Sequence, residues 1–193
     1  CRQRLPNNMG IPAEQIQVLS PTRKGVCGTV NLNRALQAAL NPPAAGKRQK
    51  LWGDMVFREG DRVMQTRNNY DVVWEKDDGA MGAGIFNGDV GVIQEIDPSG
   101  ELITIQFDDR TCVYTADLLN QLDMAYAMTV HKAQGSEYRC VVLDTAITRA
   151  RELLVLVGDD VAPGQMAAND RQQRRYSGLR RRLREEAANH GME

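Results

Sequence analysis

Cysteine is scarce in this sequence, and no long apolar run occurs in it. Four cysteines are spread over 193 residues, and no two have the close spacing of a zinc site: Cys1, Cys27, Cys112 and Cys140. We therefore expect reduced thiols in a cytoplasmic protein. No apolar stretch approaches the roughly 20 residues that a membrane span needs, so we expect no contact with a membrane. We also expect that no secretory signal precedes the fold.

A strong excess of charge is missing as well. The formal net charge of −1 argues against a globally basic nucleic-acid binder. Arginine is nevertheless concentrated in residues 170–188, which predict a helix interrupted near Ser177 and Gly178. A solvated basic face is the commoner role of such a charge run, and contact with nucleic acid is the alternative. The arginines are Arg171, Arg174, Arg175, Arg180, Arg181, Arg182 and Arg184.

The most informative stretch covers residues 125–138, A-Y-A-M-T-V-H-K-A-Q-G-S-E-Y. Residues 125–128 are apolar and predict a buried strand, and Thr129 can cap the helical turn predicted for residues 130–134. Such a strand brings polar side chains to the carboxyl edge of a sheet, where ligands bind in open α/β proteins. An ordinary solvated loop is the alternative. The polar side chains are Thr129, His131, Lys132, Gln134, Ser136 and Glu137.

Two blocks carry a family resemblance. Residues 129–138 resemble motif V of superfamily 1 helicases, in the spelling of the RecD-type branch. Residues 145–151, T-A-I-T-R-A-R, are similar to motif VI of the same enzymes. Two motifs in the family's order, each beside an apolar strand, are more specific than either alone. The resemblance covers residues 18–185 and extends to the α-subunit of exodeoxyribonuclease V. It implies an α/β fold: a RecA-like parallel sheet of the P-loop NTPase type with an inserted SH3-like β-barrel.

The first part of the chain suits the RecA-like fold. After an irregular lead-in over residues 1–14, residues 16–19 predict a strand, and a helix opens at Gly28 with Thr29 as cap and stops at residues 41–43. Residues 18–43 resemble motif IV, in which a basic side chain approaches the nucleotide phosphates. Arg23 and Lys24 both fit this role, and a solvated charge is the alternative for either. The predicted apolar face of the helix consists of Leu32, Ala35, Leu36, Ala39 and Leu40.

The middle of the chain changes to alternating periodicity. Short strands are predicted at residues 62–66, 90–96, 102–107 and 112–114, after a polar linker at residues 44–50. Such strands at hairpin spacing favour a small antiparallel barrel. The resemblance identifies it as the inserted SH3-like barrel, whose DNA-facing loops would contain Asn69, Tyr70 and Asn87. It is completed by a glycine-rich hairpin arm over residues 72–84 and by a short turn of helix or an edge strand over residues 116–122.

The α/β pattern resumes after the barrel. Residues 140–143 and 153–157 predict parallel strands, with a helix over residues 145–151 between them. Only nine residues (144–152) separate the strands, whereas a crossover needs at least about 10–12. We expect that a loop is missing here; the alternative is that the strands are not joined in this way. The chain thus divides into a first RecA-like part (1–53), the barrel (54–122) and a second RecA-like part with the basic helix (123–193).

The resemblance also implies the chemistry. Arg149 would be an arginine finger, Gly135 and Glu137 would contact the nucleotide with Arg23 or Lys24, and Thr129, His131 and Lys132 would contact DNA phosphates. The sequence contains no G-x-x-x-x-G-K-[ST] loop and no Asp-Glu pair of the family's magnesium site. ATP and Mg²⁺ would therefore be held mainly by an N-terminal RecA-like domain of the same polypeptide. We expect residues 1–193 alone not to hydrolyse ATP, and we assign no metal ligand.

The implied function is that of the C-terminal motor half of an ATP-dependent helicase. It would translocate 5′ to 3′ on single-stranded DNA in repair or recombination, alone or in a complex. Within this class, the helicase portion of a conjugative relaxase is the alternative. A non-catalytic module that binds single-stranded nucleic acid is the alternative of another class. A phosphate loop upstream of Cys1 would favour the helicase motor. A relaxase domain upstream of Cys1 would favour the helicase portion of a conjugative relaxase.

Overall fold

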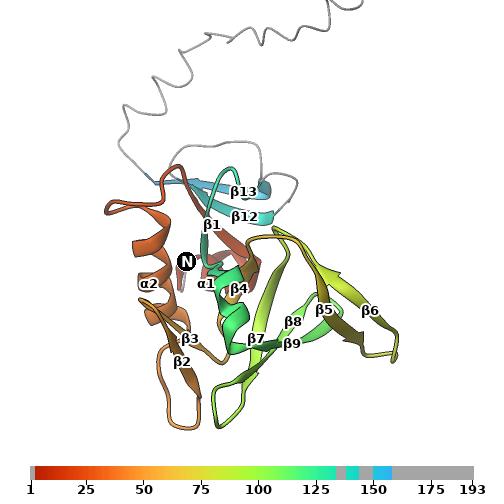
Figure 1. Ribbon diagram of the computed structural model, residues 1–193. Coiled ribbons are helices and arrows are strands. Elements are labelled where there is room, and N and C mark those ends of the chain that lie inside the picture. The colour runs from red at the N-terminus through yellow and green to blue at the C-terminus, as the bar shows by residue number, and fades with distance from the viewer. Residues whose placement is uncertain (1–2, 134–137, 144–149, 158–193) are drawn as a thin grey trace, which may run out of the picture. The chain divides into compact units, whose positions relative to one another are not determined.

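A four-stranded parallel sheet forms the first layer of the fold (Figure 1). The computed structural model describes residues 3–133, 138–143 and 150–157. The strand order is β11-β1-β12-β13, and every neighbouring pair is parallel. This confirms the predicted parallel sheet. Its strands are β1 (Ile16–Ser20), β11 (Ala127–Thr129), β12 (Tyr138–Leu143) and β13 (Ala150–Leu156).

The lead-in is more regular than its sequence predicts. A short helix, α1 (Arg4–Met9), ends at Gly10, whose φ of 62° suits glycine and whose N–H donates to the Pro6 carbonyl. A 3₁₀ turn at Ala13–Gln15 then leads into β1. The prediction of an irregular lead-in is therefore wrong. The physical reason is that Leu5 packs against a buried cluster that contains Ile16.

Helix α2 (Thr29–Leu40) follows β1 and ends where predicted. Its N-cap is Gly28, and Thr29 is the buried first residue of the helix, so the predicted cap is one residue too late. The predicted apolar face is also partly wrong, because Ala35 is exposed. Polar Asn33 takes a place on the packed side, where its amide oxygen accepts a 2.7 Å hydrogen bond from the Ala127 N–H.

A hairpin occupies the end of the predicted linker. Strands β2 (Gln49–Trp52) and β3 (Met55–Arg58) pair antiparallel, with Trp52 opposite Met55. Gly53 turns the chain between them with a φ of 56°. The linker was predicted from the polar and basic composition of residues 44–50, and β2 begins at Gln49 within it.

The second layer is an antiparallel sheet of seven strands in the order β10-β4-β7-β8-β9-β5-β6. The strands predicted from alternating periodicity are confirmed, and the hairpin arm is the β5–β6 pair. A 3₁₀ turn at Ala116–Gln121 stands where the short turn of helix or edge strand was predicted. The strands are β4 (Arg62–Gln65), β5 (Asn69–Lys76), β6 (Met81–Ile85), β7 (Val90–Ile96), β8 (Leu102–Phe107), β9 (Arg110–Thr115) and β10 (Leu122–Met124).

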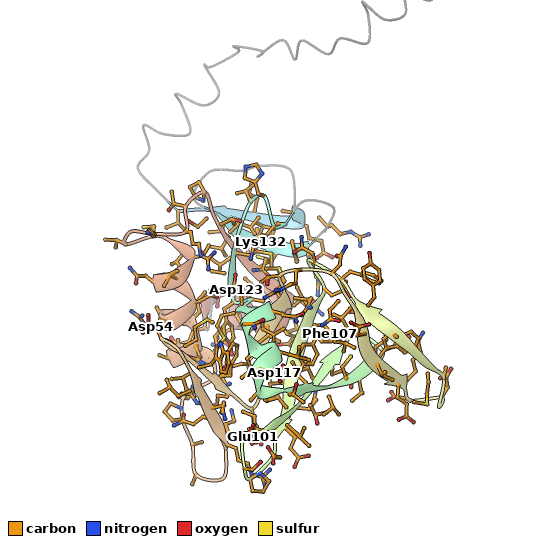
Figure 2. The ribbon with its side chains drawn as sticks, in the orientation of Figure 1. Asp54, Glu101, Phe107, Asp117, Asp123 and Lys132 are labelled. Atoms are coloured by element: carbon orange, nitrogen blue, oxygen red, sulfur yellow. The ribbon has the colours of Figure 1, made fainter. Side chains whose placement is uncertain are left out.

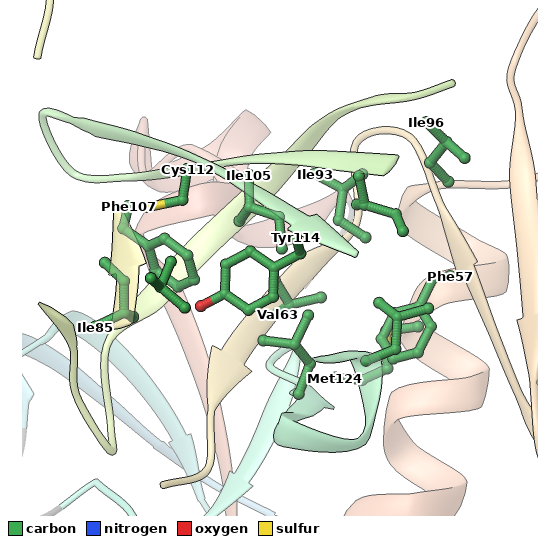
Figure 3. Close-up of a cluster of buried hydrophobic side chains, with 14 of the residues drawn as sticks. Phe57, Val63, Ile85, Ile93, Ile96, Ile105, Phe107, Cys112, Tyr114 and Met124 are labelled. Carbon is green, nitrogen blue, oxygen red and sulfur yellow. The ribbon is translucent and has the colours of Figure 1, made fainter. Parts of the chain in front are cut away.

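Apolar side chains of this sheet form the main core (Figure 3). Ile103, Ile105 and Phe107 are fully buried, as their alternation along the strand predicts. Tyr114 is also fully buried, and its hydroxyl donates a 3.2 Å hydrogen bond to the Gln65 side chain. Burial raises the pKa of Tyr114, so this hydroxyl stays protonated.

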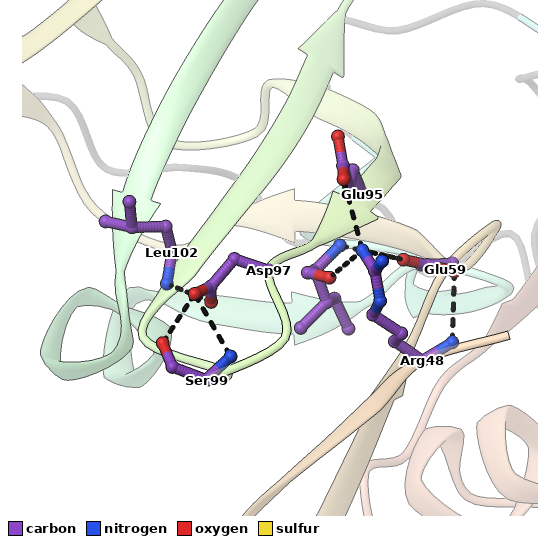
Figure 4. Close-up of polar contacts among 7 residues, drawn as sticks. Arg48, Glu59, Glu95, Asp97, Ser99 and Leu102 are labelled. Carbon is purple, nitrogen blue, oxygen red and sulfur yellow. Dashed lines mark hydrogen bonds and ion pairs between the residues drawn. The ribbon is translucent and has the colours of Figure 1, made fainter.

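Polar contacts connect the hairpin to the large sheet (Figure 4). The Arg48 guanidinium donates 2.8 Å and 3.1 Å hydrogen bonds to the Ile96 carbonyl and the Glu95 carboxylate. In the β7–β8 turn, Asp97 accepts a 2.8 Å hydrogen bond from the Leu102 N–H and another from the Ser99 hydroxyl. The bond from Leu102 replaces water at a backbone N–H in the turn.

The second part of the chain differs in detail from the prediction. Leu122–Met124 pairs with β4 in the antiparallel sheet, and the parallel strand begins at Ala127 rather than at Ala125. Ala150 and Arg151 belong to strand β13 rather than to a helix, because their backbone pairs beside β12. Strands β12 and β13 are parallel neighbours, as expected. The rest of the predicted helix, residues 145–149, and the basic tail lie outside the described residues.

Candidate nucleic-acid site

A cavity of about 690 Å³ opens beside the edge strand of the parallel sheet. Helix α2, the β2–β3 hairpin and strands β10 and β11 contribute its walls. Its lining combines several apolar side chains with a few charged and amide groups, as ligand pockets usually do. The lining residues are Arg23, Thr29, Val30, Asn33, Arg34, Gln37, Trp52, Gly53, Asp54, Met55, Val56, Met64, Asp123, Met124, Ala127, Met128, Thr129 and Lys132.

Thr129 and Lys132 lie together at this cavity. Parallel strands β1 and β11 end side by side, with Ser20 opposite Thr129. The chain then makes a turn in which the Lys132 N–H donates a 3.4 Å hydrogen bond to the Thr129 hydroxyl. The Ala133 N–H donates to the Thr129 carbonyl at 3.2 Å. The predicted capped turn is therefore present, and it leaves His131 exposed.

Asp123 joins two of the predicted site residues. One carboxylate oxygen of Asp123 lies 2.8 Å from Lys132 Nζ, and the other lies 3.6 Å from Arg23 Nη2. Figure 2 shows Asp123 and Lys132 beside one another. Asp123 belongs to β10, whereas both cations follow strands of the parallel sheet. Sequence reasoning missed Asp123, because nothing local distinguishes it from an ordinary surface carboxylate.

The structure separates Arg23 from Lys24. The Arg23 side chain is 67% exposed and lines the cavity, whereas Lys24 is exposed and is not among the lining residues. Their loop closes tightly on the start of α2, because a Cβ at Gly28 would lie 2.5 Å from the Lys24 carbonyl carbon. Of the two basic candidates, only Arg23 is thus brought to Thr129 and Lys132.

The barrel candidates form a separate group outside the cavity lining. Tyr70 and Phe86 are exposed and meet edge to face, with ring centroids 5.7 Å apart. The Asn69 amide donates a 3.0 Å hydrogen bond to the Gln121 side chain, so it supports the loop. Asn87 is exposed. These residues offer a solvent-facing aromatic pair with amides nearby.

The nucleotide candidates Gly135, Glu137 and Arg149 lie outside the described residues. The exposed guanidinium of Arg23 fits an anionic phosphate in charge and access. Among the described residues, no three His, Cys, Asp or Glu side chains are grouped to hold a metal ion. In the same part of the chain, no helix is both long and apolar enough to cross a membrane.

Sequence comparisons match two segments to families. Residues 32–107 match the SH3 domain of ATP-dependent RecD-like DNA helicases, and residues 124–146 match the UvrD-like helicase C-terminal domain. The ATP-dependent RecD2 DNA helicase of Deinococcus radiodurans is 34% identical in an alignment of 184 residues that covers 88% of this chain and 23% of that protein. The RecBCD enzyme subunit RecD of Mycolicibacterium smegmatis is 29% identical, over 89% of this chain and 30% of that protein.

Solved helicase structures are also similar. Pif1 helicase from Candida albicans gives a TM-score of 0.46 at 15% identity, covering 80% of this chain and 46% of that chain. Bacteroides Pif1 bound to single-stranded DNA gives a TM-score of 0.45 at 13% identity, covering 79% of this chain and 45% of that chain. This chain spans less than a third of the length of the RecD2 helicase and of the RecD subunit named above. A segment that matches the RecD-like SH3 domain, a UvrD-like C-terminal segment and RecD relatives along most of its length make the chain similar to the RecD-type helicases.

Proposed function

We propose that the chain is the C-terminal motor half of an ATP-dependent DNA helicase and that it binds single-stranded DNA through Thr129, His131 and Lys132. The observation that carries this proposal is the placement of Thr129 and Lys132 at one cavity, where parallel strands β1 and β11 end. That edge of an open parallel sheet is the usual place for ligands. The RecD relatives and the SH3 domain give the ligand its chemical class.

The charges at this edge suit a phosphate backbone. The Lys132 side chain is 33% exposed and its ammonium group pairs with Asp123, so a phosphate oxygen can reach it from solvent. Thr129 and His131 add a hydroxyl and an imidazole on the same turn. Contacts of this type position a strand without reading its sequence. The barrel loops, with Asn69, Tyr70 and Asn87, would hold the bases that follow.

We propose that Arg149 stabilises charge on the transferring phosphoryl group and that Gly135 and Glu137 receive the nucleoside. Arg23 or Lys24 would be the motif IV cation that approaches the nucleotide phosphates. ATP and Mg²⁺ would be held mainly by an N-terminal RecA-like domain of the same polypeptide. This proposal also includes domain boundaries at residues 53/54 and 122/123 and translocation in the 5′-to-3′ direction. It further includes a cytoplasmic location and a role in a repair or recombination complex.

Binding of a labelled single strand to residues 1–193 tests the proposal. We expect Lys132→Ala to weaken binding to every sequence alike and to reduce the slope of log K against log salt by about 0.7. Lys50→Ala is the matched control, because Lys50 is 25% exposed, pairs with Glu101 and does not line the cavity. Equal binding by Lys132→Ala and Lys50→Ala at each salt concentration would refute the DNA contact.

A further inference from the structure

Methionine is concentrated around the cavity. Met55, Met64, Met124 and Met128 all line it, which is half of the eight methionines in the chain. Three of these are buried, and the half-buried Trp52 lies on the same lining. A methionine side chain has three rotatable bonds and a polarisable sulfur, so it adapts its shape and makes favourable contacts with aromatic rings.

The cavity has the size and position to receive a flat ring. Ligand pockets typically measure about 300–1,000 Å³, and this one measures about 690 Å³. Its rim holds the cations Arg23 and Lys132, with Asp123 between them. A DNA phosphate that replaces Asp123 at Lys132 would leave its nucleoside next to the methionine lining.

Two of the polar side chains that line the cavity, the amides of Asn33 and Gln37, are already engaged. The Asn33 amide donates to the carbonyls of Met124 and Ala127, at 3.1 Å and 2.8 Å. The Gln37 amide donates to the Val56 carbonyl at 2.7 Å and to the Asp61 carboxylate at 2.6 Å. Neither amide nitrogen is therefore free to read the edge of a base. A ring in this cavity would be held by apolar contact, which every base can make.

We infer that the cavity receives one unstacked base of the single strand and holds it without sequence preference. This inference rests on the proposed function, since that function places the phosphates on Thr129 and Lys132. It adds a base subsite formed by the methionines and Trp52, distinct from the exposed pair Tyr70 and Phe86. The phosphate replaces Asp123 at the rim, and the carboxylate returns when the strand leaves.

Two probes test the subsite on residues 1–193. One is a labelled oligothymidylate, and the other is a strand of equal length whose residues are abasic. The tested variant is Val30→Trp, because Val30 lines the cavity from α2 and is 47% exposed, so that the indole can fill the cavity. Val113→Trp on β9 is the matched control, since Val113 is 54% exposed and is not among the lining residues.

We expect Val30→Trp to weaken oligothymidylate binding about tenfold and to leave abasic binding unchanged, whereas Val113→Trp changes neither. Because the introduced indole can itself stack on a base, Trp52→Ala is tested as a second variant that adds no ring. It should weaken binding of oligothymidylate and leave binding of the abasic strand unchanged. Val30→Trp should weaken binding of oligoadenylate as much as it weakens binding of oligothymidylate. Equal effects of both tryptophan variants, together with no selective effect of Trp52→Ala, would overturn the subsite.

The two proposals fail in different ways. If Lys132→Ala weakens both strands but Val30→Trp and Trp52→Ala have no selective effect, the DNA contact stands and the base subsite is wrong. If Lys132→Ala leaves binding of the abasic strand and of oligothymidylate unchanged, the proposed function fails, and the base subsite fails with it. Far-ultraviolet circular dichroism of each variant confirms that the fold is retained.

Discussion

The Tyr126 hydroxyl donates a 2.9 Å hydrogen bond to the carboxylate of Asp61, and this bond joins the two sheets. Tyr126 precedes β11 of the parallel sheet, whereas Asp61 precedes β4 of the antiparallel sheet. Asp61 is fully buried. Burial and the neighbouring Asp61 charge both raise the pKa of Tyr126, so the hydroxyl keeps its proton and remains a donor.

Three more donors complete the surroundings of Asp61. The side-chain amides of Asn41 and Gln37 donate at 2.7 Å and 2.6 Å, and the Arg58 N–H donates at 2.7 Å. A buried carboxylate is tolerated only when such bonds replace its hydration. Helix α2, strand β3, the residue before β11 and the residue before β4 therefore meet at one charge. This charge lies close to the cavity that Gln37 lines.

Tyr126→Phe removes one donor to this buried charge. A hydrogen bond to a charged group contributes about 1.5–3 kcal/mol, so the free energy of unfolding should fall by about that amount. Urea unfolding followed by circular dichroism measures it. Tyr70→Phe is the control: its hydroxyl is on an exposed side chain, and its effect should stay within about 0.5 kcal/mol. Equal midpoints for the two variants would contradict the role of this bond.

The β7–β8 turn should depend on pH through Asp97. The Ser99 hydroxyl, and then the Leu102 N–H, lower the pKa of Asp97 from 3.8 to about 2. Because the folded value is the lower one, the charged carboxylate stabilises the fold above pH 3.8, and this contribution is lost as the pH falls towards 2. A carboxyl carbon NMR titration should show the low pKa. Ser99→Ala should move the pKa of Asp97 back towards 3.8, and an unchanged titration would contradict this assignment.

Tyr70→Ala should weaken binding of single-stranded DNA. Neither Tyr70 nor Phe86 fills the core, since they are 66% and 41% exposed, so either ring can stack on a base. Such stacking contributes about 1–3 kcal/mol per base, which corresponds to a loss of about fivefold or more in affinity. Fluorescence anisotropy at moderate salt measures it. Val73→Ala is the control, because Val73 is 56% exposed on the same strand and cannot stack. Unchanged affinity in Tyr70→Ala would exclude this contact.

Arg149→Ala tests the proposed arginine finger in a protein that includes the proposed N-terminal RecA-like domain. DNA-stimulated ATP hydrolysis should fall by about 10³–10⁵, while DNA binding stays nearly unchanged. Arg149→Lys should also fail, since an ammonium cannot reproduce the planar fork of a guanidinium. Arg67→Ala, which removes an exposed side chain bonded to Asn120, is the control. Hydrolysis within about tenfold of the unchanged protein would show that Arg149 is not the finger.

Local patterns were sufficient for most of the strands. Ile103, Ile105 and Phe107 alternate with polar residues, and such alternation indicates a half-buried strand wherever it occurs. The apolar runs at β1 and β12 indicated strands buried on both faces. Thr129 before a polar turn indicated its own hydrogen bond to the Lys132 N–H. In each case the signal and the structure involve residues that are close in the chain.

Contacts between distant segments could not be predicted in this way. The sequence determined the two kinds of sheet, but only the tertiary structure decided that Asp123 of one sheet faces Arg23 and Lys132 from loops of the other. The same holds for Ala35, which is exposed because α2 turns Asn33 towards the Ala127 backbone instead. A side chain's partner depends on where two elements meet in space, and periodicity along one element carries no information about that position.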